Sequence, residues 1–239
     1  MNKEEINFNI LINKARKNDL TFLHYENSKT KINTIIRKNK LPDFVVNYLW
    51  QSKVYKKELI KHQIITSNIR QDILNNYTNE NSPWPSILIG FLKYHKPLKE
   101  ELEPFFYTNS RISLILDCWD LQPDICLELG ADSILYDIIR NYSTRNEHDY
   151  RRIVRITSYI ISKMPTIRFR LLDEIIKTSD HMIIKILGPA LKSIYLDDDI
   201  VNYLLIKLKK NVFKSLTQIA INRDNISESM IAKIYLAVD

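Results

Sequence analysis

Residues 41–49 read Leu41-Pro42-Asp43-Phe44-Val45-Val46-Asn47-Tyr48-Leu49, and 155 positions later the chain reads Leu196-Asp197-Asp198-Asp199-Ile200-Val201-Asn202-Tyr203-Leu204. Six of the nine positions are identical. In both stretches a proline or an aspartate precedes an apolar run, which is typical of the start of a helix. The recurrence predicts a repeated structural unit in which Leu49 and Leu204 occupy equivalent buried positions. The alternative is a chance match in a chain rich in leucine, isoleucine, asparagine and lysine.

Four prolines extend this pattern along the chain. Pro42, Pro83, Pro123 and Pro165 lie 41, 40 and 42 residues apart, and each precedes an apolar run. Proline is favourable in the first turn of a helix because the N–H that it lacks would have no helical partner there. A proline at this spacing therefore predicts a helical unit that recurs about every 40 residues.

The composition favours helices over sheets. The chain of 239 residues is 45% hydrophobic, enough for a sizeable core, and contains three glycines. Sheet turns and phosphate-binding loops both depend on glycine, so its scarcity disfavours both. Apolar residues at helical spacing predict an all-α protein with roughly fourteen short helices and no strand.

The repeat pattern also predicts how the chain is divided. We expect capping helices over residues 1–40 and a helical repeat domain over residues 41–239. Its units are expected to start near residues 42, 83, 123, 165 and 197. Two polar stretches, 75–82 and 141–149, are both short for a domain boundary, so one continuous domain is the alternative.

Helix-start prolines at this spacing, with paired apolar helices, resemble HEAT or armadillo repeats. Residues 219–231 are also similar to a unit of the leucine-rich-repeat variant. The resemblance is one of architecture. It implies a right-handed α-solenoid of stacked short helices that binds a protein or a nucleic acid. One HEAT-like group, the AlkD-like DNA glycosylases, has a similar length and basic charge, but its motif does not match this chain position by position.

The sequence indicates no membrane segment and no secretory signal. No run approaches the roughly 20 apolar residues of a transmembrane helix. The start of the chain, Met1-Asn2-Lys3-Glu4-Glu5, is charged, with no apolar stretch behind it. The two cysteines, Cys118 and Cys126, are expected to be buried core residues of a protein in the reducing cytoplasm.

A search for catalytic or cofactor-binding motifs indicates a protein that is not an enzyme. Three scattered glycines cannot form a dinucleotide-binding or phosphate-binding loop. The five histidines are far apart, and none has a second histidine or cysteine at ligand spacing. We therefore expect no catalytic residue, no cofactor and no metal.

The strongest candidate for a binding site is a group of arginines. Three of them share one helical face, and two more follow one helix later, with a tryptophan as a candidate neighbour. The predicted partner-binding residues are Arg151, Arg152, Arg155, Arg168, Arg170 and Trp119. Arginine suits phosphate and carboxylate partners alike. The alternative is internal pairing with carboxylates such as Asp137, Asp173 or Glu174. A second basic group comprises Lys53, Lys56, Lys57 and Lys61.

The distribution of charge bears on the class of partner. Residues 1–80 carry a formal charge of +6, residues 81–147 carry −4, and residues 148–239 carry +5, which gives the total of +7. Phosphate contacts need a continuous line of positive charge, which the acidic middle interrupts. We expect a binding protein of inhibitor, immunity or adaptor type whose partner is a protein. The alternative is a HEAT-like nucleic-acid-binding protein or an AlkD-like DNA glycosylase.

Overall fold

The protein is helical throughout the part of the chain that the computed structural model describes. The described residues are 3–24, 29–77, 85–107, 112–142, 147–220 and 226–238, and they form sixteen α-helices and one 3₁₀ helix, with no strand. The all-α prediction is confirmed over these ranges. None of their helices combines the length and the apolar character that a membrane crossing requires.

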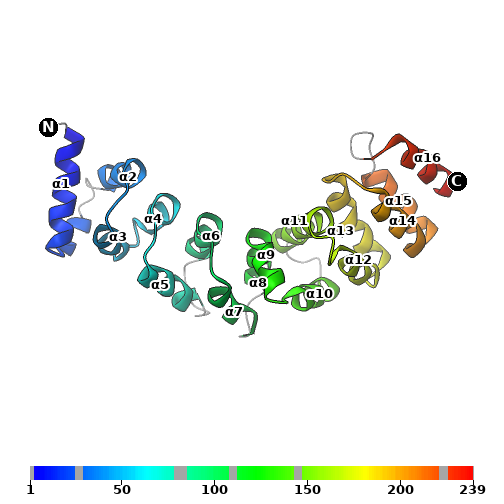
Figure 1. Ribbon diagram of the computed structural model, residues 1–239, viewed down its shortest axis with the longest axis horizontal. Helices are drawn as coiled ribbons and strands as arrows, with labels where there is room; N and C mark the ends of the chain where they lie inside the picture. Colours follow the sequence, from blue (N-terminus) through cyan, green and yellow to red (C-terminus); the bar gives the residue numbers. More distant parts are fainter. Residues whose placement is uncertain are drawn as a thin grey trace. The chain divides into compact units, whose positions relative to one another are not determined.

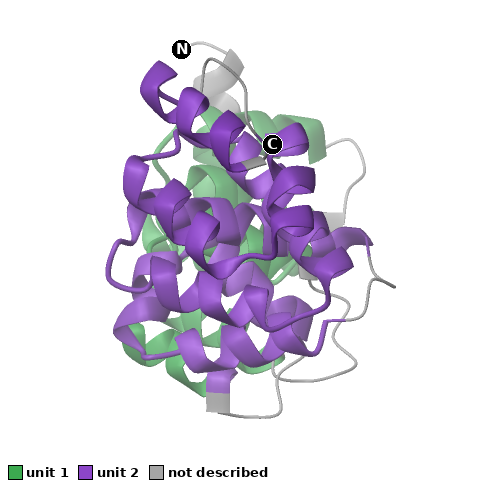
Figure 2. Cartoon of the chain, turned by 90° about the vertical axis from the view of Figure 1, so that its right-hand side faces the viewer, with its two compact units in different colours: residues 1–104 green, residues 105–239 purple. Residues whose placement is uncertain are grey.

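The chain forms two compact units, residues 1–104 (unit 1) and residues 105–239 (unit 2) (Figure 2). The elements that begin in unit 1 are α1 (Lys3–Arg16), η1 (Leu20–His24), α2 (Lys29–Lys38), α3 (Asp43–Trp50), α4 (Lys56–His62), α5 (Ser67–Tyr77), α6 (Pro85–Tyr94) and α7 (Lys99–Tyr107), and the last three residues of α7 belong to unit 2. The elements of unit 2 are α8 (Ile112–Leu121), α9 (Pro123–Glu128), α10 (Asp132–Arg140), α11 (Glu147–Lys163), α12 (Arg168–Ile176), α13 (Asp180–Lys192), α14 (Asp198–Lys207), α15 (Lys210–Ala220) and α16 (Glu228–Val238).

In unit 1, helices α2, α4 and α6 pack side by side in chain order (Figure 1). Gln63, which follows α4, donates a hydrogen bond from Nε2 to the carbonyl oxygen of Ile36 in the last turn of α2, at 2.5 Å. His95, which follows α6, places Nε2 2.7 Å from the carbonyl oxygen of Ile60 in the last turn of α4. The C-terminal ends of the three helices therefore lie beside one another, and the helices run parallel.

Side-chain hydrogen bonds also connect α3, α5 and α7 to one another in chain order. Trp50 of α3 donates from Nε1 to the carboxylate of Asp72 in α5, at 2.7 Å. Arg70 of α5 donates to both carboxylate oxygens of Glu101 in α7, at 2.7 and 2.5 Å. Alternate helices thus make direct side-chain contacts, while the helices between them form the other row (Figure 1).

Unit 2 repeats this alternation. Helix α11 packs between α8 and α13, and α13 packs against α15. The hydroxyl of Tyr150 in α11 donates to the carbonyl oxygen of Lys185 in α13 at 2.9 Å, and the hydroxyl of Ser158 donates to that of Ala190 at 3.1 Å. Because the residue numbers rise together along both helices, α11 and α13 also run parallel.

The two matching stretches of sequence begin at the same point of their helices. Pro42 is the N-cap residue of α3, and Asp197 is that of α14. The Asp197 carboxylate accepts a hydrogen bond from the backbone N–H of Ile200 at 2.9 Å. Pro42 cannot make the equivalent bond, because its side chain has no acceptor atom. Leu49 and Leu204 are both buried, with 0% and 4% of their surface exposed.

The polar residues of the matching stretches make matching contacts. The Tyr48 hydroxyl donates to the carbonyl oxygen of Asp19, earlier in the chain, at 2.5 Å. The Tyr203 hydroxyl likewise donates backward, to the Asp173 carboxylate. Their asparagine neighbours accept hydrogen bonds from later segments: Asn47 from Thr66, and Asn202 from Lys233. In both stretches, therefore, tyrosine joins the helix to an earlier segment and asparagine joins it to a later one.

The helix starts do not follow the spacing of the prolines. Pro42 is an N-cap, Pro123 is the first residue of α9, and Pro165 lies in the turn before α12. Pro83 lies outside the described residues. Helices α10, α12, α14 and α16 start at residues 132, 168, 198 and 228, so their spacing falls from 36 to 30. Proline is favourable at many positions before a helix, so it does not mark equivalent points of the unit. The division at residues 40 and 41 stays a prediction.

His95 predicts a pH dependence of unit 1. Burial lowers the pKa of His95 below its ordinary value of 6.5, and the charge of nearby Arg70 acts in the same direction. A depressed pKa in the folded state means that the unfolded chain binds the proton more readily. The stabilisation is present above pH 6.5 and is lost as the pH falls through the folded pKa. We expect the urea concentration at the unfolding midpoint to decrease when the pH is lowered from neutral to mildly acidic.

Two substitutions test whether His95 causes this pH dependence of stability. His95→Gln keeps a donor for the Ile60 carbonyl and removes the titrating ring, so its urea midpoint should depend less on pH than that of the wild type. His181→Gln, at an exposed position of α13, should leave the pH dependence unchanged. An equal pH dependence of the wild type and His95→Gln would contradict the assignment.

Candidate functional site

The structure places the predicted arginines beside carboxylates of neighbouring helices. Arg152 of α11 is 4% exposed, and its Nη2 lies 2.5 Å from the Asp117 carboxylate of α8. Its Nη1 lies 3.0 Å from Asp149, one turn earlier in α11. Burial raises the pKa of Asp117, although the charge of Arg152 opposes that shift. Arg152 therefore neutralises two buried carboxylates, which is a structural role.

Arg155, one turn after Arg152, makes a similar link at the surface. It donates to both carboxylate oxygens of Asp120 in α8, at 2.9 and 2.5 Å. The side chain of Arg155 is 55% exposed, whereas that of Asp120 is 14% exposed. Among the described residues, Arg151 pairs with Glu147 of its own helix at 3.1 Å, and both side chains are exposed.

The remaining two predicted arginines lie on α12. Arg168 is 2.8 Å from the Asp197 carboxylate, which caps α14, and its guanidinium lies 4.7 Å from the centre of the Phe169 ring. Arg170 is 3.3 Å from Asp132 of α10. The two side chains thus connect α12 to different neighbours, Arg168 toward the next helix of the row and Arg170 toward the previous one.

Trp119 does not belong to a surface in this structure. It lies in α8 with 1% of its surface exposed, and its Nε1 has no hydrogen-bond partner among the described residues. A partner that leaves the fold unchanged cannot contact Trp119 or Arg152. Each of the five arginines lies beside one or two carboxylates, and a partner-binding role of these arginines stays a prediction. The internal pairing that the sequence left open is what the structure contains, with different partners: Asp117, Asp120, Asp132, Glu147, Asp149, Asp197 and Asp199.

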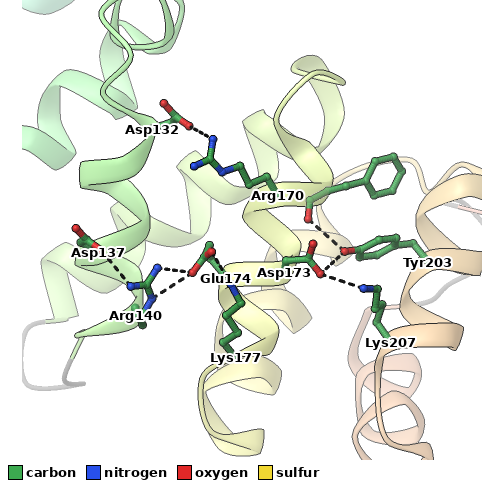
Figure 3. Close-up of polar contacts among 10 residues, drawn as sticks. Asp132, Asp137, Arg140, Arg170, Asp173, Glu174, Lys177, Tyr203 and Lys207 are labelled. Carbon is green, nitrogen blue, oxygen red and sulfur yellow. Dashed lines mark hydrogen bonds and ion pairs between the residues drawn. The ribbon is translucent and has the colours of Figure 1, made fainter.

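A further row of charges crosses α10, α12 and α14 (Figure 3). Arg140 of α10 donates to Glu174 of α12 at 2.6 Å, and Lys177 lies 2.8 Å from the other oxygen of Glu174. Hydrogen bonds from Lys177 and Arg140 lower the pKa of Glu174, and the charges of both side chains add to the shift. Asp173 faces the opposite neighbour and lies 3.5 Å from Lys207 of α14.

This row is electrically balanced. It contains four carboxylates and four basic side chains, and in Figure 3 each basic side chain is joined to at least one of the carboxylates: Asp132, Asp137, Asp173 and Glu174 with Arg140, Arg170, Lys177 and Lys207. A balanced row holds neighbouring helices in register. Each positive charge of the row already faces a negative one, so we expect the row not to attract a polyanion.

Among the described residues, we identify no group of side chains arranged for catalysis. Within the described ranges, no three His, Cys, Asp or Glu side chains are grouped so that they could hold a metal ion. Cys118 and Cys126 are buried, and burial raises the pKa of both thiols, so they remain protonated and unreactive.

The lysines of unit 1 differ from the arginines of unit 2. Lys56 is buried, with Nζ 4.5 Å from the centre of the Trp50 ring and 3.7 Å from Asp72. Lys53, Lys57 and Lys61 are exposed. The predicted lysine group is therefore split, and Lys61 instead lies at the end of α4 among lysines of other helix ends. Lysines at the ends of successive helices are the sequence signal that could have indicated this grouping.

Comparison with known proteins adds no relative. The chain matches no protein family, no curated protein and no solved structure.

Proposed function

We propose that this chain is a non-enzymatic helical-repeat protein that binds a macromolecular partner, and that the partner is a protein. An inhibitor, immunity or adaptor protein would have these features. Within each unit, we propose that the two rows of helices are the layers of a right-handed, HEAT-like α-solenoid. The parallel direction of alternate helices and the recurring tyrosine and asparagine contacts support this arrangement.

The pairing of the arginines is the observation that carries the choice of a protein partner. Arg152, Arg155, Arg168 and Arg170 each face a carboxylate from another segment of unit 2. A nucleic acid would have to displace those carboxylates before its phosphates could bind. Protein surfaces, in contrast, commonly pair with mixed charged and apolar surfaces of this kind.

Nucleic-acid binding, including the AlkD-like glycosylase activity, is the second candidate, and the charge of unit 1 favours it. Residues 1–104 carry 17 Lys and Arg against 11 Asp and Glu, or +6, whereas residues 105–239 carry 18 against 17, or +1. The excess positive charge is thus concentrated in unit 1, as a phosphate-binding surface would require.

Binding of labelled duplex DNA and single-stranded RNA, measured by fluorescence anisotropy, tests the choice. We expect dissociation constants above ~10⁻⁴ M at physiological salt, weaker than ordinary non-specific binding. We also expect no release of bases from alkylated DNA. A stoichiometric complex with a protein, whose affinity changes little with salt, would support the proposal. Micromolar binding to DNA that falls by about 10³-fold or more between low and moderate salt would contradict it.

A further inference from the structure

The parallel helices α2, α4 and α6 bring three turns of unit 1 to one edge. These turns follow the three helices and lead into α3, α5 and α7. The contacts of Gln63 with the end of α2, and of His95 with the end of α4, show that the turns are neighbours. Gln63 Oε1 also accepts a hydrogen bond from the backbone N–H of Leu41, which ties the first turn to the second at 2.8 Å.

Exposed lysines and exposed aliphatic side chains gather at these turns. We call them the basic edge, and define it by Lys40, Lys61, Lys93, Lys96, Lys99, Ile64 and Leu98, all of which are exposed. Among the described residues, no carboxylate lies within ion-pair distance of Lys40, Lys61 or Lys96. Two exposed carboxylates, Asp43 and Glu100, lie in the first turns of α3 and α7 and leave the edge positive. This surface therefore differs from the balanced row of unit 2.

Two other carboxylates near the edge are already engaged. Glu101 binds Arg70 and accepts a hydrogen bond from the backbone N–H of Leu98 at 2.7 Å, which fixes the third turn. Glu58 binds Arg37 through both of its oxygens, at 2.8 and 2.9 Å. The hydrogen bond from Arg37 lowers the pKa of Glu58, and the nearby charge of Lys61 acts in the same direction, so Glu58 offsets part of the positive charge of the edge.

The aliphatic side chains decide between two classes of partner. Ile64 is 76% exposed and Leu98 is 59% exposed, and each lies within three residues of a lysine of the edge. A phosphate backbone offers no apolar surface to cover such side chains. A protein segment with both carboxylates and aliphatic residues would pair with the lysines and remove Ile64 and Leu98 from water.

We propose that the basic edge is an interaction surface for an acidic, amphipathic segment of a protein partner. The proposal rests on the function proposed above and names the surface and the chemistry of the partner. Carboxylates of the segment bind Lys40, Lys61 and Lys96, and its aliphatic side chains pack on Ile64 and Leu98. Hydrogen bonds of Gln63, His95 and Glu101 join and order the turns that carry these groups, so the surface is present in the unbound chain.

The test uses the full chain and three fluorescent probes. One is a helix-forming peptide of about 20 residues with glutamate and leucine on one face, the second has serine in place of leucine, and the third is oligo-dT of about 20 nucleotides. Binding is measured by anisotropy at low and at physiological salt. Circular dichroism and thermal unfolding confirm that each variant is folded.

Two variants alter the edge, and a third serves as a matched control. Lys40→Glu/Lys61→Glu/Lys96→Glu reverses three charges at the C-terminal ends. The control, Lys29→Glu/Lys31→Glu/Lys57→Glu, makes the same charge change at exposed positions near the N-terminal starts of α2 and α4. Ile64→Ser/Leu98→Ser removes the aliphatic contacts and keeps the charge.

We expect the wild type to prefer the leucine peptide over both other probes. The edge triple variant should bind it about tenfold more weakly, and the control should bind within about twofold of the wild type. Ile64→Ser/Leu98→Ser should abolish the preference for leucine over serine. Equal losses in the edge variant and the control would overturn the proposal, since net charge alone would then explain binding.

The remaining outcomes separate this proposal from the proposed function. If the wild type binds none of the three probes, the basic edge is not such a surface, and a protein partner would contact another part of the chain. If oligo-dT binds best, with a steep dependence on salt that the edge variant removes, the edge binds nucleic acid. That result would overturn both the proposal and the choice of a protein partner.

Discussion

Replacing Arg152 by methionine should lower the free energy of unfolding by ~3–5 kcal/mol, the usual effect of breaking one side of a buried ion pair. The guanidinium lies 2.5 Å from Asp117 and 3.0 Å from Asp149, and 4% of the residue is exposed. Without it, two carboxylates remain in a poorly solvated site. Urea unfolding followed by circular dichroism measures the loss.

The pH dependence of the same variant identifies the cause. Burial already raises the pKa of Asp117, and removing Arg152 would raise it further. The destabilisation should therefore shrink in mildly acidic solution, where that carboxylate takes up a proton. Arg151→Met is the matched control, because Arg151 is exposed on the same helix, and its effect should be within ~0.5 kcal/mol. Equal effects of the two substitutions would show that Arg152 is not a structural ion-pair partner.

Leu49→Ala and Leu204→Ala should each lower the free energy of unfolding by ~2–5 kcal/mol, the range for buried leucines. The two side chains are 0% and 4% exposed and follow the same Val-Asn-Tyr sequence. Since Leu49 belongs to unit 1 and Leu204 to unit 2, the two losses should be independent of each other. Thermal unfolding of the single and double variants measures both points.

Leu236→Ala provides the control for the leucine substitutions. Leu236 is 84% exposed on α16, so its removal should change the stability by no more than ~0.5 kcal/mol. If Leu49→Ala or Leu204→Ala has an effect as small as that of Leu236→Ala, the match between residues 41–49 and 196–204 would be a coincidence of composition.

The local pattern of the sequence was sufficient for the helices. The Ser179 hydroxyl accepts a hydrogen bond from the backbone N–H of Met182 at the start of α13, which is the usual role of serine at an N-cap. The three aspartates at 197–199 were expected at a helix start, and α14 begins there. Such predictions succeed because capping and amphipathic spacing involve residues within one or two turns of each other.

The sequence predicted the length of the repeat less accurately than it predicted the helices. The prolines suggested a unit of about 40 residues, whereas successive helices of one row in unit 2 start 30 to 36 residues apart. α9 begins at Pro123, where the proline spacing predicted a unit to start, but it is a short additional helix of six residues between α8 and α10. Gly130, at a φ of 68°, ends it with a turn that favours glycine. Short additions of this kind shift the spacing of prolines without changing which helices pack together.

The sequence by itself determined the helical class and many helix starts, because short-range patterns specify them. The equivalence of residues 41–49 and 196–204 stays a prediction. Only the tertiary structure decided which charges are available. The arginines of unit 2 meet carboxylates that lie 29 to 38 residues away when they belong to another helix of the stack, as with Arg168 and Asp197 or Arg170 and Asp132. Pairing over that distance depends on which helix faces are brought together. The same packing placed lysines in or just after the ends of α2, α4 and α6 at one edge of unit 1, where they are exposed.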